Sequence, residues 1–143
     1  MEGPDTEETT LFFMLAHHGR GQLNRCLRVP LRGREVFLCA RCTGILCGFL
    51  AQLSLLFTVL VINPVLGNCL LLILPLPSVA DWVTQRLGYR ESVNPLRVST
   101  GLLLGADFAH RLSRISENPL DPYVLLTSAL YLLTVALITH RTQ

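Results

Sequence analysis

Four apolar segments, joined by short polar connections, dominate the chain. The first covers residues 42–62, contains no ionised side chain and has Gln52 as its most polar member. About 20 apolar residues are enough for a helix to cross the ~30 Å hydrocarbon core of a bilayer. Pro75 and Pro77 should bend or break the second segment. We therefore predict an all-α membrane protein with four transmembrane helices, over residues 42–62, 68–87, 95–115 and 122–139.

The composition favours a membrane location over a soluble helical bundle. Half of the residues (50%) are hydrophobic and only 15% are charged, whereas about a quarter of the residues in a typical soluble domain are charged. A helix buried in a soluble protein still carries a polar stripe, and residues 42–62 lack one. The length of 143 residues fits one domain. The formal net charge of +2 argues against a general nucleic-acid binder.

The arginines lie almost entirely on one side of the expected membrane. Arg111 and Arg114 fall near the opposite face. The others are Arg20, Arg25, Arg28, Arg32, Arg34, Arg41, Arg86, Arg90, Arg97 and Arg141. By the positive-inside rule, we expect a multi-pass protein of the plasma membrane with both termini in the cytoplasm. Residues 1–16, an acidic tail and a short helix, lack the features of a signal peptide and should be retained.

The polar segment of residues 17–43, directly ahead of the four-span bundle of residues 44–143, combines three cysteines with a histidine pair. These side chains are His17, His18, Cys26, Cys39 and Cys42. Three thiolates and one imidazole form a closed tetrahedral Zn²⁺ site, and Cys39-x-x-Cys42 has the spacing of one half of such a site. The gap between Cys26 and Cys39 suits a hairpin that returns the third sulfur. We predict a cytoplasmic zinc knuckle with His17 or His18 as fourth ligand, His18 being closer to the hairpin.

Two other interpretations of the thiols stay open. In a reducing cytosol a fixed disulfide is improbable, and Arg25, Arg28 and Arg41 would favour the thiolates that both metal binding and redox chemistry require. Cys39-x-x-Cys42 at the start of a helix could act as a redox pair, because the helix dipole lowers the pKa of a thiol there. The thiols could also be neighbours in sequence alone. The number of ligands favours structural zinc.

A second polar cluster lies at the cytoplasmic ends of spans two and three. Its members are Asp81, Gln85, Arg90, Glu91, Ser92, Asn94, Arg97 and Thr100. Ionisable side chains at membrane depth are costly and usually face a partner or a wet cavity, so Asp81, Glu91, Arg90 and Arg97 are candidates for catalysis or ligand binding. The alternative is a structural network in which Asp81 or Glu91 pairs with Arg90 or Arg97.

Span three carries two further patterns. Asp107 and Arg111 are four residues apart on one helix face, so Arg111 can either extend outward to the membrane interface or pair with Asp107, and we expect the ion pair. Glycines recur four residues apart in spans one and three, at Gly44, Gly48, Gly101 and Gly105. This spacing predicts a close crossing of the two helices, although it is also common by chance in membrane helices.

Two ordered motifs make the chain resemble a known family. The motifs are Leu38-Cys39-Ala40-Arg41-Cys42-Thr43-Gly44, preceded by His17-His18 and Cys26, and Asp81…Gln85…Gly88-x-Arg90-Glu91-Ser92-x-Asn94…Arg97…Gly101. The chain resembles the small prokaryotic membrane proteins of the domain of unknown function 2085 family, in an archaeal-looking branch with a His pair ahead of the first Cys. The resemblance runs from residue 17 to about residue 105. It implies an integral membrane protein and supplies no established reaction.

The sequence leaves two functions open. The first is a structural or interaction subunit, in which zinc orders the N-terminal segment and the arginine-rich hairpin binds anionic lipid headgroups or a protein partner. The second is a membrane enzyme or transporter acting on a phosphate-bearing lipid or small anion, held by Arg90 and Arg97, with Asp81 or Glu91 as base. The absence of a nucleophile motif or phosphate loop favours the first. Whether the chain is an enzyme, and whether it forms an oligomer, does not follow from the residues.

Overall fold

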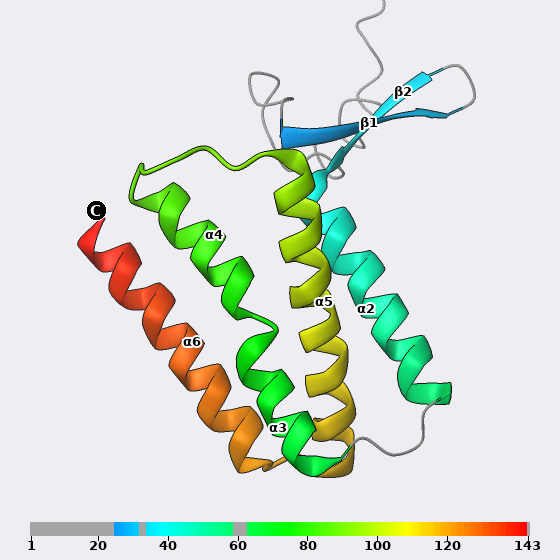
Figure 1. Cartoon of the computed structure of the whole chain (residues 1–143), viewed down its shortest axis with the longest axis vertical. Coiled ribbons are helices and arrows are strands. Elements are labelled where there is room, and N and C mark those ends of the chain that lie inside the picture. The colour runs from blue at the N-terminus through cyan, green and yellow to red at the C-terminus, as the bar shows by residue number, and fades with distance from the viewer. Residues whose placement is uncertain (1–24, 32–33, 59–62, 143) are drawn as a thin grey trace, which may run out of the picture.

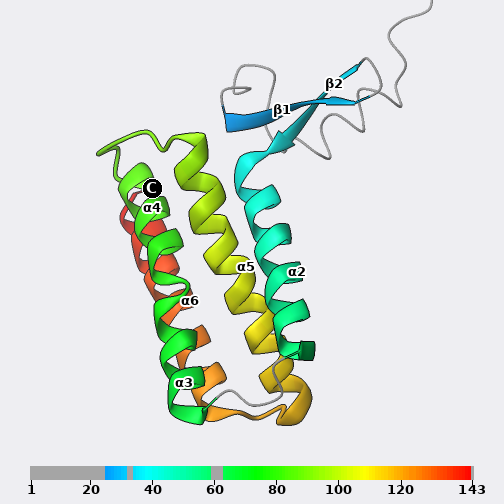
Figure 2. The same ribbon diagram turned by 45° about the vertical axis from the view of Figure 1, so that its right-hand side comes forward.

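The computed structural model describes residues 25–31, 34–58 and 63–142. The segment of residues 1–16 and the predicted zinc ligands His17 and His18 lie outside the described residues. A two-stranded hairpin is followed by helices that lie side by side and make up most of the described structure (Figure 1 and Figure 2). The elements are β1 (Cys26–Leu31), β2 (Arg34–Cys39), α2 (Ala40–Thr58), α3 (Pro64–Ile73), α4 (Leu76–Arg86), α5 (Asn94–Glu117) and α6 (Pro122–Arg141).

The hairpin has the geometry that the cysteine spacing predicts. Strands β1 and β2 are antiparallel, and their register makes Cys26 and Cys39 direct partners. The guanidinium carbon of Arg28 lies 5.7 Å from the centroid of the Phe37 ring, a favourable cation–π contact across the two strands. Since β2 ends at Cys39 and α2 begins at Ala40, the hairpin is fixed to one end of the helical bundle, beyond the start of α5 (Figure 1).

Helices α2 and α5 form the tightest contact in the bundle, and glycine makes it possible. A Cβ atom added at Gly101 would lie 2.6 Å from the carbonyl oxygen of Arg41. Gly44, Gly48 and Gly105 approach backbone atoms of the facing helix even more closely. Only a hydrogen atom fits at these positions, so the two backbones can touch. The close crossing expected from the glycine spacing is confirmed.

The second predicted span is two consecutive helices that together form a bent rod. Helix α3 starts earlier than expected, at Pro64, because the side chain of Asn63 caps it by accepting a hydrogen bond from the amide of Val65 at 2.9 Å. Leu74 and Pro75 separate α3 from α4, and Pro75 is the N-cap of α4. Proline cannot donate a backbone hydrogen bond inside a helix, which explains why the rod bends there.

Two helices in the described part are long and apolar enough to cross a membrane. They are the rod of Pro64–Arg86 and helix α6, Pro122–Arg141. Helix α2 is apolar over the shorter stretch Ala40–Leu56. Large apolar side chains point outward, and Val65 of α3 and Leu126 of α6 are 70% and 69% exposed. Apolar surface of this extent is unfavourable in water and favourable in lipid.

The interior is correspondingly polar. Helix α5 touches α2, α3, α4 and α6, and its buried residues include Arg97, Asp107 and His110. Two of the largest fully buried side chains are carboxylates, Asp81 and Asp107. Buried charges need partners, so the placement of these carboxylates determines where the polar clusters form.

Candidate functional site

The hairpin, the start of α2 and the start of α5 meet at one end of the bundle. The side-chain amide of Asn94 in α5 donates to the carbonyl oxygen of Cys26 at 3.3 Å. Within the first turn of α2, the hydroxyl of Thr43 donates to the carbonyl oxygen of Cys39 at 3.0 Å. The bond from Asn94 joins the hairpin to the polar cluster that the sequence places at the ends of spans two and three, and the bond from Thr43 joins the end of β2 to α2.

The three cysteines of the predicted zinc knuckle lie at this junction. Cys26 and Cys39 are 4% and 7% exposed, whereas Cys42 is exposed. Burial raises the pKa of the Cys26 thiol, as does neighbouring Cys39, while Arg97 acts to lower it. Among the described residues, no three His, Cys, Asp or Glu side chains converge so as to hold a metal ion. The zinc site, which includes His17 or His18, stays a prediction.

Asp81 of α4 is the centre of the polar cluster. Its side chain is 1% exposed and forms ion pairs with Arg41 of α2, at 2.5 Å, and with Arg90 of the α4–α5 loop, at 3.0 Å. The amide of Gln85, one turn further along α4, donates to Oδ2 of Asp81 at 2.7 Å. Gly88 ends α4 with a φ of 75°, a conformation that glycine adopts without strain, and the loop then returns Arg90 to Asp81.

An arginine-rich pocket lies next to this cluster. It has a volume of about 280 Å³ and is lined by Arg25, Cys39, Arg41, Cys42, Ile45, Gln85 and Arg97; we call it the arginine pocket. Arg97 is 6% exposed and donates to Oε1 of Gln85, a neutral acceptor, at 3.3 Å. Within the described residues, no carboxylate forms an ion pair with Arg97, and the Nε atoms of Arg97 and Arg41 are buried with no hydrogen-bond partner.

A second polar cluster lies deeper in the bundle, around Asp107 of α5. Arg111, one turn along the same helix, donates to Oδ2 of Asp107 at 2.6 Å, so the expected ion pair is present. The same guanidinium donates to the carbonyl oxygen of Leu71 and to the hydroxyls of Thr127 and Ser128, each at 2.9 Å. One side chain of α5 therefore holds α3 and α6 together, and its single charge is balanced by a single carboxylate.

The model of a known protein family matches residues 22–110, which is more than half of the chain and includes the hairpin, the arginine pocket and Asp107. That family is the domain of unknown function 2085, described as a predicted membrane protein. The chain belongs to this family. Its outward-facing apolar side chains and its two long apolar helices agree with association of this family member with a lipid bilayer.

Two archaeal relatives are similar to this family member. An uncharacterised protein of Methanothermobacter thermautotrophicus is 41% identical over 89 residues, which are 59% of this chain and 80% of the relative. An uncharacterised protein of Methanocaldococcus jannaschii is 32% identical over 87 residues. The match covers 56% of this chain and 56% of that relative, so the chain spans about half of its length. No solved structure matches the chain.

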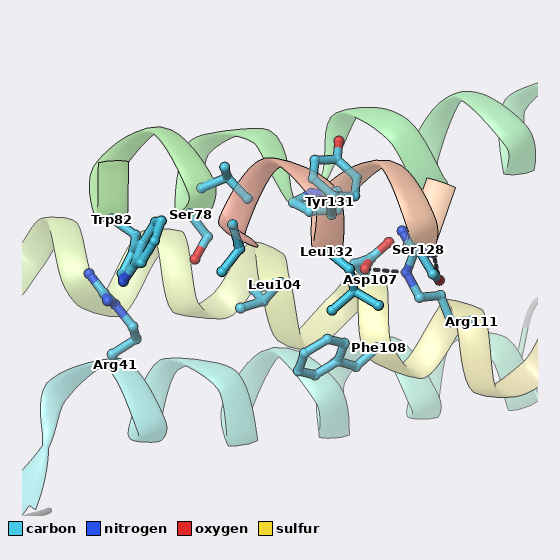
Figure 3. A pocket seen from close by; sticks show the side chains of 13 residues that line it. Arg41, Ser78, Trp82, Leu104, Asp107, Phe108, Arg111, Ser128, Tyr131 and Leu132 are labelled. Atoms are coloured by element: carbon cyan, nitrogen blue, oxygen red, sulfur yellow. Dashed lines mark hydrogen bonds and ion pairs between the residues drawn. The ribbon is translucent and has the colours of Figure 1, made fainter. Parts of the chain in front are cut away.

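An apolar cavity of about 520 Å³ lies between α4, α5 and α6, and α6 is outside the part that matches the domain of unknown function 2085 family. Its lining residues are Arg41, Pro75, Ser78, Val79, Trp82, Leu104, Asp107, Phe108, Arg111, Ser128, Tyr131, Leu132 and Val135. Figure 3 shows Arg41 and Trp82 together at one end and Asp107, Arg111 and Ser128 toward the other. We call this space between α4, α5 and α6 the apolar cavity.

The sequence predicts part of the polar cluster around Asp81 and of the arginine pocket. The Asp81–Arg90 pair is one of those expected. Glu91 is exposed and does not line the arginine pocket. The main omission is Arg41, for which the sequence predicts a place beside the thiols and no pairing with Asp81. In the structure it is the closer ionic partner of Asp81. The glycine pattern held part of the signal, because Gly101 of α5 contacts the backbone of Arg41. It does not specify the contact of the Arg41 side chain with Asp81 of α4.

Proposed function

We propose that this protein binds a phosphate group in the arginine pocket, either as inorganic phosphate or as part of a phosphate-bearing lipid. The observation that carries the proposal is a surplus of positive charge. Arg25, Arg41 and Arg97 line the pocket, and Asp81, the carboxylate beside it, is already bonded to Arg41 and Arg90. A bound anion would balance the positive charge that the described residues leave uncompensated.

The donor groups suit a phosphate. A guanidinium offers a planar set of N–H donors that matches two phosphate oxygens, and such charge-assisted bonds are stronger than bonds between neutral groups. The buried Nε atoms of Arg41 and Arg97 lack partners among the described residues. Because Arg97 is only 6% exposed, its interaction with an anion would be weakly screened by water and salt.

The arrangement supports binding rather than catalysis. A general base needs a lone pair free to accept a proton from substrate. Asp81 instead accepts hydrogen bonds from Arg41, Arg90 and Gln85. We therefore assign two roles to this cluster: it holds an anion, and it joins the hairpin to the helices. The proposal takes the lipid headgroup as partner from the predicted interaction subunit and the anion-binding arginines from the predicted enzyme or transporter.

We place the pocket on the cytoplasmic side of a four-span bundle in the plasma membrane. Arg86 donates to the hydroxyl of Thr142 at 2.9 Å, so the end of α6 lies at the same end of the bundle as the hairpin and its arginines. The positive-inside rule assigns this end to the cytoplasm. A cysteine introduced at Asn118 should react with an impermeant maleimide in intact cells, whereas a cysteine introduced at Thr142 should not. The wild-type protein, with its native cysteines only, gives the background labelling. The reverse pattern contradicts the assignment.

The binding test uses the full-length protein in phosphatidylcholine nanodiscs. Radiolabelled inorganic phosphate should bind, and Arg97→Gln should weaken binding by roughly tenfold to a hundredfold, the usual effect of losing a charge-assisted hydrogen bond. Arg86→Gln is the matched control, because Arg86 lies at the same end of the bundle and does not line the pocket.

The same preparation distinguishes the two sources of the phosphate. If the ligand is a lipid, phosphatidic acid added to the nanodiscs should displace labelled phosphate, and phosphatidylcholine should not. If only inorganic phosphate competes, the ligand is the free anion. Absence of saturable phosphate binding by the wild type, or equal binding by Arg97→Gln, refutes the proposal.

We also propose that a structural zinc ion is held by Cys26, Cys39, Cys42 and one of His17 or His18. The support is that Cys26 faces Cys39 across the hairpin and that Cys42 lines the arginine pocket beside Cys39. Three thiolates and one Zn²⁺ have a net charge of −1, which would leave the pocket, with its three arginines, positively charged.

Elemental analysis of protein without a histidine tag tests the zinc proposal. About one zinc per chain is expected, and Cys39→Ser should remove it. Cys69→Ser is the control, because Cys69 lies in α3, outside the knuckle. A zinc content that does not respond to Cys39→Ser contradicts the proposed ligand set.

A further inference from the structure

We infer that the phosphate-bearing ligand is an amphiphile, with its phosphate in the arginine pocket and one apolar chain in the apolar cavity. The inference rests on the proposed function, because it takes the phosphate as bound by the arginine pocket. It adds that the natural ligand is a lipid phosphate rather than the free anion, and it assigns a role to α6 as a wall of the site.

Arg41 connects the two spaces. It lines both the arginine pocket and the apolar cavity. Its backbone lies against Gly101 at the α2–α5 crossing, and its guanidinium reaches Asp81 of α4. A ligand bound to the free edge of this guanidinium would therefore have the arginine pocket on one side and the apolar cavity on the other.

The apolar cavity has the size and lining for a hydrocarbon chain. Its volume of about 520 Å³ lies within the usual range of roughly 300–1,000 Å³ for small-molecule sites. Three helices supply apolar walls, among them Val79 of α4, Leu104 and Phe108 of α5, and Val135 of α6. A phosphate alone would fit within the smaller arginine pocket and would leave this larger space without a role.

The two ends of the cavity match the two ends of an amphiphile. At one end Trp82 lies beside Arg41 (Figure 3), and tryptophan is enriched where a membrane protein meets the lipid headgroups. Asp107 is six residues beyond Gly101, about 9 Å deeper along the α5 axis. It forms a neutral pair with Arg111, so a chain that reaches this depth meets no unbalanced charge.

The test compares alkyl phosphates of different length as competitors of labelled inorganic phosphate in phosphatidylcholine nanodiscs. Each methylene buried should tighten binding roughly fourfold, so octyl phosphate should compete at a concentration at least tenfold lower than butyl phosphate. Leu104→Trp narrows the cavity and should reduce this gain at least tenfold while leaving the affinity for inorganic phosphate unchanged. Leu112→Trp is the matched control, the same change on α5 outside the cavity.

Octyl phosphate also partitions into the bilayer more than butyl phosphate does. This partition is the same for Leu104→Trp and Leu112→Trp, so the comparison of the two variants corrects for it. Val135→Phe, which narrows the cavity from α6, replaces Leu104→Trp if that variant does not fold. Equal competition by butyl and octyl phosphate, or a gain that survives in the narrowed variant, overturns the inference and leaves the proposed function standing. Absence of any phosphate binding by the wild type overturns both.

Discussion

Asp81 and Asp107 are both buried carboxylates bonded to arginine, and the two clusters around them differ in charge balance and in depth. Among the described residues, Asp107 has one ionic partner, Arg111, on its own helix, and the remaining donors of that guanidinium bond to neutral groups of α3 and α6. In the same part of the chain Asp81 has two ionic partners from different segments, Arg41 and Arg90, and a further buried arginine lies nearby.

The difference separates a structural cluster from a binding cluster. The donors of Arg111 are used within the bundle, and the atom left without a partner there is Oδ1 of Asp107, a hydrogen-bond acceptor. A charge that is matched one to one in this way leaves no surplus of positive charge for an anion. A cluster in which arginines outnumber carboxylates next to a cavity has unused donors and an uncompensated field. By this comparison, the deeper cluster holds the helices together and the cluster at the hairpin end can bind an anion.

The largest expected effect is that of Asp107→Asn. The change leaves the charge of Arg111, whose side chain is 11% exposed, without a carboxylate inside the bundle. Breaking a buried ion pair in this way costs about 3–5 kcal/mol, so the thermal unfolding temperature in detergent should fall sharply. The double variant Asp107→Asn/Arg111→Met should regain part of the loss, because an apolar pair can replace a buried ion pair. An unaffected single variant would show that the pair does not stabilise the bundle.

Asp81→Asn should have a smaller effect. It removes the partner of Arg41 and Arg90, but these side chains are 27% and 43% exposed and can be hydrated where they are. We expect a loss of about 1–3 kcal/mol in the same unfolding experiment, the usual penalty for a disrupted buried hydrogen-bond group. Glu91→Gln, at an exposed neighbour, is the control and should change little. A loss greater than that of Asp107→Asn would reverse the comparison.

Arg97→Gln should have the smallest effect on stability. The change removes a hydrogen bond to Gln85, worth about 1 kcal/mol, and at the same time relieves repulsion from the other arginines of the pocket. In the absence of phosphate, the unfolding temperature should therefore stay within the change expected for about 1 kcal/mol. A loss comparable to that of Asp107→Asn would identify Arg97 as a structural residue rather than one that holds a ligand.

The elements that follow from local sequence were predictable. Apolar runs located the helices, and the spacing of Cys26 and Cys39 correctly predicted the hairpin. The Asp107–Arg111 pair follows from helical periodicity alone, because both residues belong to one helix. Pro75 predicted the bend between α3 and α4, although it did not reveal that Asn63 starts the rod four residues early.

The contacts that join distant segments were not predictable in the same way. Arg41 of α2 reaches Asp81 of α4, and the glycine pairs bring α2 only against α5. A pattern in one segment therefore does not reveal which residue of a third helix an arginine will meet. Likewise, the carbonyl oxygen of Leu71 accepts a hydrogen bond from Arg111 because α3 lies beside α5. The arginine pocket joins residues of β2, α2, α4 and α5, so its lining follows from neither motif alone.

The reach of Arg111 to α3 and α6 has a consequence for how the protein is made. A charged residue near the centre of a helix opposes insertion of the helix from the translocon by about 2.5–3.5 kcal/mol. Helix α5 carries Asp107 near its centre and Arg111 one turn closer to its end. In the four-span topology that we propose, we expect α5 to enter the bilayer poorly as an isolated helix and to be retained when α6 offers the hydroxyls of Thr127 and Ser128. The helix that joins the others in the finished bundle is thus the one whose insertion depends on a segment synthesised after it.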